Sequence, residues 1–353
     1  MINVLPDRPR LSNGYSRGAV PLPEKTLIDL VRRMARERSA DKTARSTSGA
    51  ILTGIGDDCA VLRPIRGQDF LVTTDFSLEG IHFRRDWHPA ESVGHRCLAR
   101  GLSDIAAMGG EPVAAFLSLA LPRDLPQAWV MGFMRGLLKL AKRHGMTLAG
   151  GDTAESRSGI LADIVVVGAV PKGKAILRSG ARPGDRIFVS EKLGGSAAAV
   201  EAMERGGKKT LNRRQFDSRR YERHFYPQPR IELGWVLRGK QLASSMIDLS
   251  DGLSTDLAHI CDESGVGAEL DAELIPRARV GSPAREVDLE LALHGGEDYE
   301  LLFTVPAEKR IPAQIAGVTM AQIGRITRRR GMFISDSRGS RTVLKARGWE
   351  HFR

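Results

Sequence analysis

Apolar side chains recur at helical spacing in several segments of the chain. Between residues 91 and 108, for example, Val93, Cys97, Leu102 and Ile105 fall on one face of a helix. This spacing of three and four residues is typical of an amphipathic helix, because 3.6 residues complete one turn. On this basis we expect helices over residues 24–38, 91–108, 128–144, 196–203, 230–238 and 253–262.

Uninterrupted apolar runs between these segments predict β-strands. Residues 160–170 are so apolar that we expect a strand buried on both faces. Residues 70–74 predict a short buried strand that runs directly into Asp75, and a short strand at Leu148 ends at Asp152. Further strands are expected over residues 113–121, 186–190, 245–249, 299–305 and 319–326. Strands and helices mixed through both halves indicate an α/β or α+β protein.

Residues 171–184 carry Pro, Gly and Lys in quick succession, which predicts a connection between two domains. The length of 353 residues agrees with two domains of roughly 100–200 residues each. We therefore expect a loose N-terminal extension over residues 1–20, an N-terminal domain over 21–171 and a C-terminal domain over 172–353, which includes a basic insertion over 205–228.

The composition is that of an ordinary globular protein, with 42% hydrophobic and 27% charged residues. The three cysteines, Cys59, Cys97 and Cys261, lie far apart, which argues against a disulfide framework or a zinc ribbon. No apolar run approaches the roughly 18 residues that a membrane span needs. The first 20 residues lack the apolar core of a secretory signal. We therefore expect a cytoplasmic protein without membrane contact.

The net charge of +11 favours anionic partners but does not choose among them. Basic residues are densest over residues 205–223, and Tyr221, Phe225 and Tyr226 lie in or beside this stretch. A nucleic-acid-binding surface is one interpretation. A solvated surface insertion is the favoured one, because runs of charge usually face water.

Aspartates beside Gly, Ser or Thr are the most informative feature, and most of them end an apolar run. They are Asp57 and Asp58, Asp75, Asp104, Asp152, and Asp248 with Asp251. Any one of them is more often a turn residue than a ligand, and Ser250 or Asp251 can simply cap the helix that follows. Together they favour a metal–phosphate site formed where loops converge, because divalent cations prefer oxygen ligands.

The common catalytic signatures are absent. The sequence has no GxxxxGK[ST] loop, and Cys59 replaces the last glycine of a GxGxxG pattern. It also lacks HExxH and a kinase catalytic loop. If the protein is an enzyme, these absences indicate charge neutralisation rather than covalent catalysis.

Several motifs, in order along the chain, resemble the thiamine-monophosphate kinase family. They are residues 54–61 (GIGDDCAV), 74–83 (TDFSLEGIHF), 102–109 (LSDIAAMG), 150–153 (GGDT), 178–185 (RSGARPGD), 247–252 (IDLSDG), 295–300 (GGEDYE) and 348–352 (GWEHF). The resemblance covers roughly residues 24–352. The broader superfamily, which is similar to aminoimidazole ribonucleotide synthetase, shares the fold and some of the aspartate motifs.

The resemblance implies a two-domain α/β (α+β) fold of the aminoimidazole-ribonucleotide-synthetase type, with an N-terminal mixed sheet that pairs across a homodimer. It also implies ATP-dependent phosphorylation of thiamine phosphate to thiamine diphosphate, the last step of thiamine diphosphate biosynthesis, by direct in-line transfer assisted by several magnesium ions. A related enzyme acting on another small anion, in purine or selenium metabolism, is the alternative. Nucleic-acid binding leaves the aspartates unexplained, because clustered carboxylates repel phosphates unless a metal intervenes.

The family's site residues carry over by motif. The resemblance implies that Asp58, Thr73, Thr74, Asp75, Asp104, Asp152, Asp248 and Asp251 hold magnesium, that Gly151, Arg178 and Ser250 contact ATP, and that His82, Glu297 and Trp349 line the thiamine-phosphate site. No general base is expected, because the attacking phosphate has a second pKa of about 6 and is mostly ionised at neutral pH. The metal and Arg178 would stabilise the charge.

The three substrate residues each have a chemical role and a structural alternative. Trp349 can stack on the thiamine rings, and Glu297 can balance the thiazolium cation. Alternatively, His82 is a packed core histidine, Glu297 pairs with an arginine, and Trp349 seals the C-terminal part of the fold.

Overall fold

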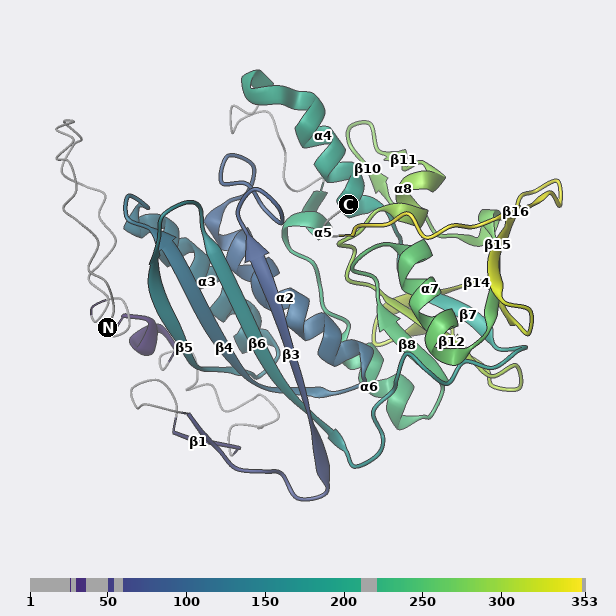
Figure 1. Cartoon of the computed structure of the whole chain (residues 1–353), viewed down its shortest axis with the longest axis horizontal. Helices are drawn as coiled ribbons and strands as arrows, with labels where there is room; N and C mark the ends of the chain where they lie inside the picture. The colour runs from purple at the N-terminus through teal and green to yellow at the C-terminus, as the bar shows by residue number, and fades with distance from the viewer. Residues whose placement is uncertain (1–25, 27–29, 36–49, 54–59, 211–220, 351–353) are drawn as a thin grey trace, which may run out of the picture.

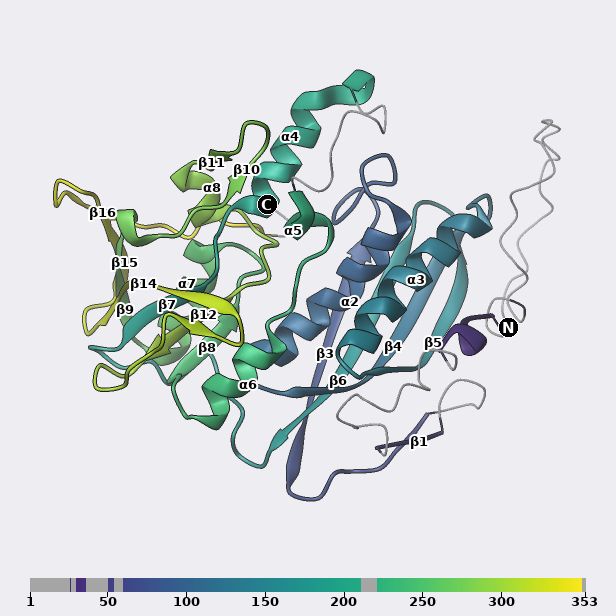
Figure 2. The same ribbon diagram turned by 180° about the vertical axis from the view of Figure 1, so that it is seen from behind.

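The structure is a computed structural model that describes residues 26, 30–35, 50–53, 60–210 and 221–350. Its first sheet has the strand order β3-β6-β4-β5, in which only the β4–β5 pair is parallel. The strands are β3 (Gln68–Leu78), β4 (Glu111–Pro122), β5 (Thr147–Ser156) and β6 (Leu161–Pro171). Two helices, α2 (Ala90–Ala107) and α3 (Gln127–Arg143), cover one face of this sheet (Figures 1 and 2).

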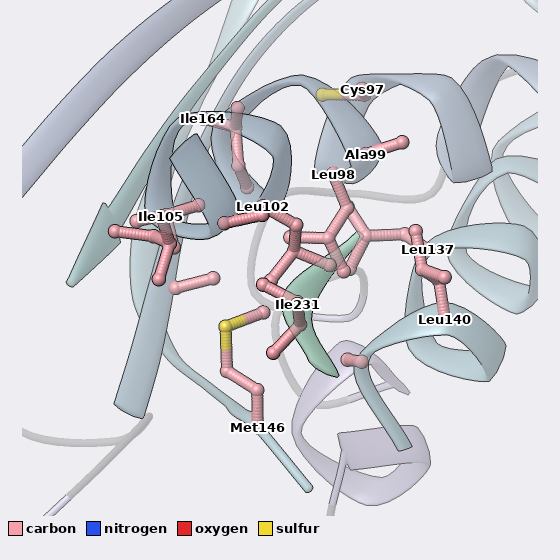
Figure 3. Packing of buried hydrophobic residues seen from close by; sticks show 14 of the residues in the cluster. Cys97, Leu98, Ala99, Leu102, Ile105, Leu137, Leu140, Met146, Ile164 and Ile231 are labelled. Atoms are coloured by element: carbon pink, nitrogen blue, oxygen red, sulfur yellow. The ribbon is translucent and has the colours of Figure 1, made fainter. Parts of the chain in front are cut away.

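The predicted apolar stripe of α2 forms the centre of the core. Leu98 and Leu102 are fully buried and pack toward Leu137 of α3, Ile164 of β6 and Ile231 (Figure 3). Glycines let the two helices approach closely: a Cβ added at Gly94 would lie 1.9 Å from the carbonyl oxygen of Phe133. A Cβ at Gly136 would lie 1.8 Å from the carbonyl oxygen of Glu91. The helix pair is therefore held at backbone contact.

The opposite face of the first sheet is open along β3, and two strand predictions are corrected here. The short buried strand expected over residues 70–74 is an edge strand of 11 residues, in which Val72 is 69% and Phe76 54% exposed. Residues in β6 alternate between buried and half-buried, so only one face of that strand is fully covered. Both differences arise because the helices cover a single face of the sheet. Ala50, Ile51, Ala60, Leu62 and Ile65 pack on the other face, around Val113 and Ala149.

The second sheet contains eight strands, in the order β16-β15-β9-β14-β7-β12-β8 with β13 paired to β14. They are β7 (Arg186–Ser190), β8 (Ser245–Asp248), β9 (Gly267–Asp271), β12 (Leu301–Val305), β13 (Gln314–Ile315), β14 (Val318–Thr327), β15 (Gly331–Ser335) and β16 (Arg341–Val343). Smaller strand pairs are β1 (Ile51–Thr53) with β2 (Val61–Leu62) and β10 (Arg279–Val280) with β11 (Arg285–Glu286). The remaining helices are α4 (Gly195–Thr210), α5 (Glu222–Phe225), α6 (Ile231–Gly239), α7 (Leu253–Ser264) and α8 (Leu289–His294), with a 3-10 turn η3 (Ala272–Leu274).

Helix α2 lies between the two sheets (Figure 1). It packs on β3 and β6 on one side and on α6 and β8 on the other. The contact with α6 is close, because a Cβ added at Gly234 would lie 2.1 Å from the carbonyl oxygen of Ala106. The two sheets therefore share one core, in which α2 is the central element. The domain limits at 171 and 172 remain a prediction; residues 172–185 form neither helix nor strand.

The hydrophobicity of the helices and the state of the cysteines were also predicted from the sequence. Among the described helices, none combines the length and apolarity that a bilayer span requires. Cys97 and Cys261 are buried and carry free thiols, while Cys59 lies outside the described residues.

Candidate functional site

Three carboxylates meet where α2 lies between the two sheets. Asp75 comes from β3, Asp104 from the last part of α2, and Asp248 from the end of β8. The hydroxyl of Thr73 donates a short hydrogen bond to Asp104, and the hydroxyl of Ser103 donates one of 2.7 Å to Asp248. Residues far apart in the sequence thus place three acidic groups together, as the aspartate motifs predicted.

The carboxylates of this cluster resist ionisation when no cation is present. Burial raises the pKa of Asp75 to about 7, and the nearby charge of Asp104 acts in the same direction. Burial and the charge of Asp104 also hold the pKa of Asp248 well above its usual range. The atom Oδ2 of Asp75 is buried without a hydrogen-bond partner among the described residues. A buried acceptor of this kind is suited to a cation.

A second acidic group is formed by the loop between β8 and α7 together with the first turns of α7. The backbone N–H groups of Asp251 and Gly252 donate to Oδ2 of Asp256, at 3.2 and 3.0 Å. Burial raises the pKa of Asp256 to about 8, and the charge of Asp251 adds to this effect. Ligand atoms of Asp251, Asp256 and His259 lie within 4.8 Å of one another. Gly252 rather than Ser250 or Asp251 is the N-cap of α7, and no side chain caps this helix.

Two of the expected metal ligands lie on the other face of the first sheet. The hydroxyl of Thr74 points away from Asp104 and donates to Oδ1 of Asp163 at 2.7 Å. Asp152 is exposed on β5, at the far edge of the sheet from β3, and its Oδ1 accepts from the backbone N–H of Thr153. The strand pairing aligns Asp152 with Asp163, on the open face. Within a single chain, Asp152 therefore lies away from the cluster of Asp75, Asp104 and Asp248.

The aspartates were expected where strands end and loops converge, but the site lies elsewhere. Asp75 and Asp152 lie inside strands, because β3 and β5 continue for several residues beyond the predicted apolar runs. Gly151 is likewise inside β5, with φ of 151°, and a Cβ there would lie 1.9 Å from the carbonyl oxygen of Leu117. The acidic cluster forms along α2, not at a single sheet edge.

An open pocket of about 450 Å³ adjoins the cluster. Its lining includes Thr73, Asp104 and Asp248 on one side and Arg178 and Glu263 on another. Arg178 is exposed to solvent, so its guanidinium group is accessible to an anion beside the carboxylates. The pocket thus places an exposed arginine beside carboxylates that can bind a cation, an arrangement that suits a phosphate group with a bound metal ion.

Glu297 is neutralised by two arginines from α2. Its carboxylate oxygens lie 2.7 Å from Nη2 of Arg96 and 2.7 Å from Nη2 of Arg100. Although burial acts in the opposite direction, the two guanidinium groups hold the pKa of Glu297 well below its usual range. The alternative that Glu297 pairs with an arginine is confirmed, with two partners instead of one. Contact with thiamine phosphate remains a prediction for this residue.

His82 and Trp349, the other two expected substrate residues, lie close to β3 and to the loop of Asp251, respectively. His82 is half-buried beyond the end of β3, and its Nδ1 accepts from the backbone N–H of Leu78 at 3.0 Å. The backbone N–H of Trp349 donates to the carbonyl oxygen of Asp251 at 3.0 Å, while the residue itself is 54% exposed. The C-terminal segment is therefore fixed next to the acidic loop, with the indole accessible. The structural alternatives, a core histidine and a sealing tryptophan, fit these exposures poorly.

Some predictions fall on residues that are not described. They are Asp58, the extension over residues 1–20 and the middle of the basic insertion, residues 211–220. At the two described ends of the basic stretch, Arg205 and Arg223 keep side-chain exposures of 80% and 49%, in line with the favoured interpretation of a solvated surface insertion, which stays a prediction for the residues between them. Arg223 also pairs with Glu191 and Glu300, and His224 and Phe225, just beyond the stretch, are buried. The beginning of the insertion continues helix α4, which extends to Thr210 and not only to residue 203.

Two arginines of α2, Arg96 and Arg100, support the site and were not predicted from the motifs. These arginines share one face of the helix with Ser103 and Asp104. Both arginines meet Glu297, Ser103 donates to Asp248, and Asp104 accepts from Thr73. Their spacing within an otherwise apolar helix was the available signal. The sequence does not show which carboxylate each arginine meets.

Comparison with known proteins places these features in context. Two family models match the chain, the N-terminal domain of AIR synthase related proteins over residues 56–203 and the C-terminal domain over residues 182–337. The chain is 40% identical over 321 residues to the thiamine-monophosphate kinase of Escherichia coli (strain K12), covering 87% of this chain and 94% of that protein.

Two solved structures are similar over almost the whole chain. The thiamine-monophosphate kinase of Stenotrophomonas maltophilia K279a has a TM-score of 0.74 at 35% identity and covers 86% of this chain and 95% of that chain. AaThiL complexed with AMPPCP and TMP has a TM-score of 0.71 at 29% identity and covers 94% of this chain and 97% of that chain. These matches confirm the α/β fold with AIR-synthase-related N- and C-terminal parts that the sequence predicted.

Proposed function

The chain belongs to the thiamine-monophosphate kinase family, and we propose on this basis that it transfers the γ-phosphoryl group of ATP to thiamine monophosphate, which gives thiamine diphosphate and ADP. The observation that carries the proposal is the 40% identity to a thiamine-monophosphate kinase over 87% of the chain. The pocket supports it independently, because it places Arg178 beside Asp104 and Asp248, next to the carboxylate of Asp75.

Magnesium fits the acidic cluster. Oδ2 of Asp75 has no hydrogen-bond partner among the described residues, and Asp75, Asp104 and Asp248 repel one another when ionised, so a hard divalent cation would stabilise all three carboxylates. We propose that these three residues and Asp251 hold it, together with Thr73. When bound, magnesium neutralises the phosphates of the two substrates, which repel by roughly 4 kcal/mol per charge pair at about 4 Å and an effective dielectric constant near 20.

The chain's own residues bind and orient the two substrates. The exposed guanidinium of Arg178 can donate two hydrogen bonds to phosphate oxygens at the mouth of the pocket. The backbone of Trp349 is bonded to Asp251 and the residue is 54% exposed, so its indole can stack on the rings of thiamine monophosphate. The acceptor phosphate is already mostly ionised at neutral pH, so no side chain needs to remove a proton from it. Positioning and charge stabilisation are therefore the whole task of the protein.

We also propose that the enzyme is a homodimer joined through its N-terminal sheets. The open face of the first sheet exposes Phe70, Val72 and Phe76, an apolar surface that is costly to leave in water. Asp152 and Asp163 lie on the same face, so a second copy would face them. The role of Asp152 in holding magnesium would then depend on the dimer.

We assign the reaction to the cytoplasm, where ATP is abundant and free thiols such as Cys97 stay reduced.

The proposal is tested by incubating the purified protein with ATP, magnesium and thiamine monophosphate, and by separating the thiamine esters chromatographically. Thiamine diphosphate and ADP should form in equal amounts. Turnover of ATP only with another small anionic acceptor would instead assign the chain a different substrate. Product formation at the level of the protein-free control would contradict the proposal.

A further inference from the structure

One face of helix α2 carries a row of polar side chains that connects the separate parts of the site. Arg96, Arg100 and Asp104 are spaced by four residues, so they lie above one another on the helix. Arg96 and Arg100 are almost completely covered, with side-chain exposures of 4% and 11%. Buried arginines are kept in position by their partners, because an unpaired guanidinium in the core is strongly unfavourable.

Arg100 joins the two halves of the site through its two terminal nitrogens. Its Nη1 donates to the carbonyl oxygen of Phe76, directly after Asp75, at 2.7 Å. Its Nη2 donates to Oε1 of Glu297 at 2.7 Å. One guanidinium group therefore fixes the separation between the metal-binding strand β3 and the loop that carries Glu297.

The loop of Glu297 needs such support. Glu297 has φ of 66°, a left-handed conformation that residues other than glycine seldom adopt. Its backbone N–H donates to the carbonyl oxygen of Ser250 at 2.7 Å, so the loop is bonded to the acidic segment that carries Asp251. Arg96 holds the other carboxylate oxygen and also donates to the carbonyl oxygen of His224. The carboxylate is thus oriented by two fixed guanidinium groups.

From these contacts we propose that Arg100 is a positioning residue of the phosphoryl transfer: by holding Glu297 against β3, it sets the place of thiamine monophosphate relative to the metal and ATP. This inference rests on the proposed function. Both of its terminal nitrogens are bonded to protein acceptors, so Arg100 is fixed in place and acts through Glu297 and Phe76. Lysine cannot replace it, because a single ammonium nitrogen does not reproduce two separate donors in a rigid plane.

The test compares the Arg100→Lys variant with the wild-type enzyme. The charge is kept but the bridge is lost, so KM for thiamine monophosphate should rise by about tenfold or more, because small displacements of a bound reactant have large effects. KM for ATP should stay within about twofold. The matched control is Arg135→Lys, which changes an exposed arginine of α3 that pairs with Glu91 at 2.9 Å, and it should leave both constants unchanged.

A double-mutant cycle with Glu297→Gln distinguishes positioning from a general loss of structure. If Arg100 acts through Glu297, the double variant should have about the same kcat/KM for thiamine monophosphate as the less active of the two single variants. Multiplied losses, or equal increases in KM for both substrates, would overturn the inference. If Arg100→Lys does not fold, Arg100→Gln is measured in its place: it also loses the bridge between Phe76 and Glu297 and should show the same selective rise.

The two proposals fail in different ways. A wild-type enzyme that does not turn over thiamine monophosphate would contradict the proposed function. An active wild-type enzyme whose Arg100→Lys variant keeps its KM for thiamine monophosphate would contradict only the positioning role.

Discussion

The hydroxyl of Ser103 donates a 2.7 Å hydrogen bond to the carboxylate of Asp248, and this bond joins helix α2 to strand β8 of the second sheet. The next residue of the helix, Asp104, accepts from Thr73 of the first sheet. Two consecutive residues of one helix therefore connect both sheets at the acidic cluster. The site is built into the interface between the sheets, so its geometry depends on the packing of α2.

The Asp75→Asn variant should lose turnover while keeping its fold. Removing this charge relieves the repulsion with Asp104 in the metal-free protein, but it also removes a ligand from the cation. We expect kcat to fall by at least about a hundredfold, with a melting temperature equal to or above that of the wild type in the absence of magnesium. Scanning fluorimetry with and without magnesium checks the second point.

The control for this variant is Asp124→Asn, which changes an exposed aspartate outside the site. It should keep both the activity and the magnesium-dependent rise in melting temperature. Retention of full activity by Asp75→Asn would remove this residue from the metal site.

The stability of the metal-free protein should fall as pH rises. The pKa values of Asp75 and Asp256, about 7 and about 8, lie above the ordinary value of an aspartate, so at these two residues the folded state holds more protons than the unfolded state from roughly pH 4 to about pH 8. Asp75 and Asp256 therefore lower the free energy of unfolding as pH rises through that window. The buried side chains of His88, His95 and His144, with pKa values of about 4, act in the opposite direction only up to about pH 6.5, so the net decrease is expected from about pH 6.5 to about pH 8, and magnesium should reverse it. Urea denaturation at several pH values, with EDTA or with magnesium, measures this. A metal-free protein that becomes more stable between these limits would contradict the assignment.

The Val72→Glu variant should separate the proposed dimer into monomers. Val72 is 69% exposed in the single chain, so a charge there costs the monomer little but is unfavourable in an apolar interface. Analytical ultracentrifugation should give a dimer for the wild type and a monomer for the variant. Val343→Glu, at a residue of β16 that is 64% exposed, is the matched control and should stay dimeric. A monomeric wild type would refute the dimer.

The Gly136→Ala variant should lose stability, because the added Cβ would lie 1.8 Å from the carbonyl oxygen of Glu91 and force α2 and α3 apart. A cost of about 1–3 kcal/mol in the free energy of unfolding is expected for overpacking of this kind. Gly239→Ala is the control, since nothing lies within 4 Å of its added Cβ. Urea denaturation that gives equal stabilities for the two variants would show that the helices can separate without cost.

Local patterns predicted much of this structure. The apolar stripe over residues 91–108 gives α2 almost to the residue, and the run over residues 186–190 coincides with β7. The motifs also identified Asp75, Asp104 and Asp248, which the structure brings together. These features depend on residues close in the sequence, where periodicity and turn chemistry are decisive.

Long-range contacts account for what the patterns missed. The extent of β3 depends on its pairing with β6 over all 11 residues, which continues through polar positions such as Asp75. Strand β9 contains Glu269 and Asp271 and is fixed by its partners β14 and β15. Similarly, the partners of Arg96 and Arg100 lie about 200 residues away, at Glu297. No local pattern specifies such pairs.

The most direct test of the account follows the transferred group itself. ATP radiolabelled at the γ-phosphate is incubated with the protein, magnesium and thiamine monophosphate, and the thiamine esters are separated. We predict that the label appears in the terminal phosphate of thiamine diphosphate, in amounts equal to the ADP formed. Label recovered only as inorganic phosphate, or remaining in ATP, would contradict the assignment of this chain as a thiamine-monophosphate kinase.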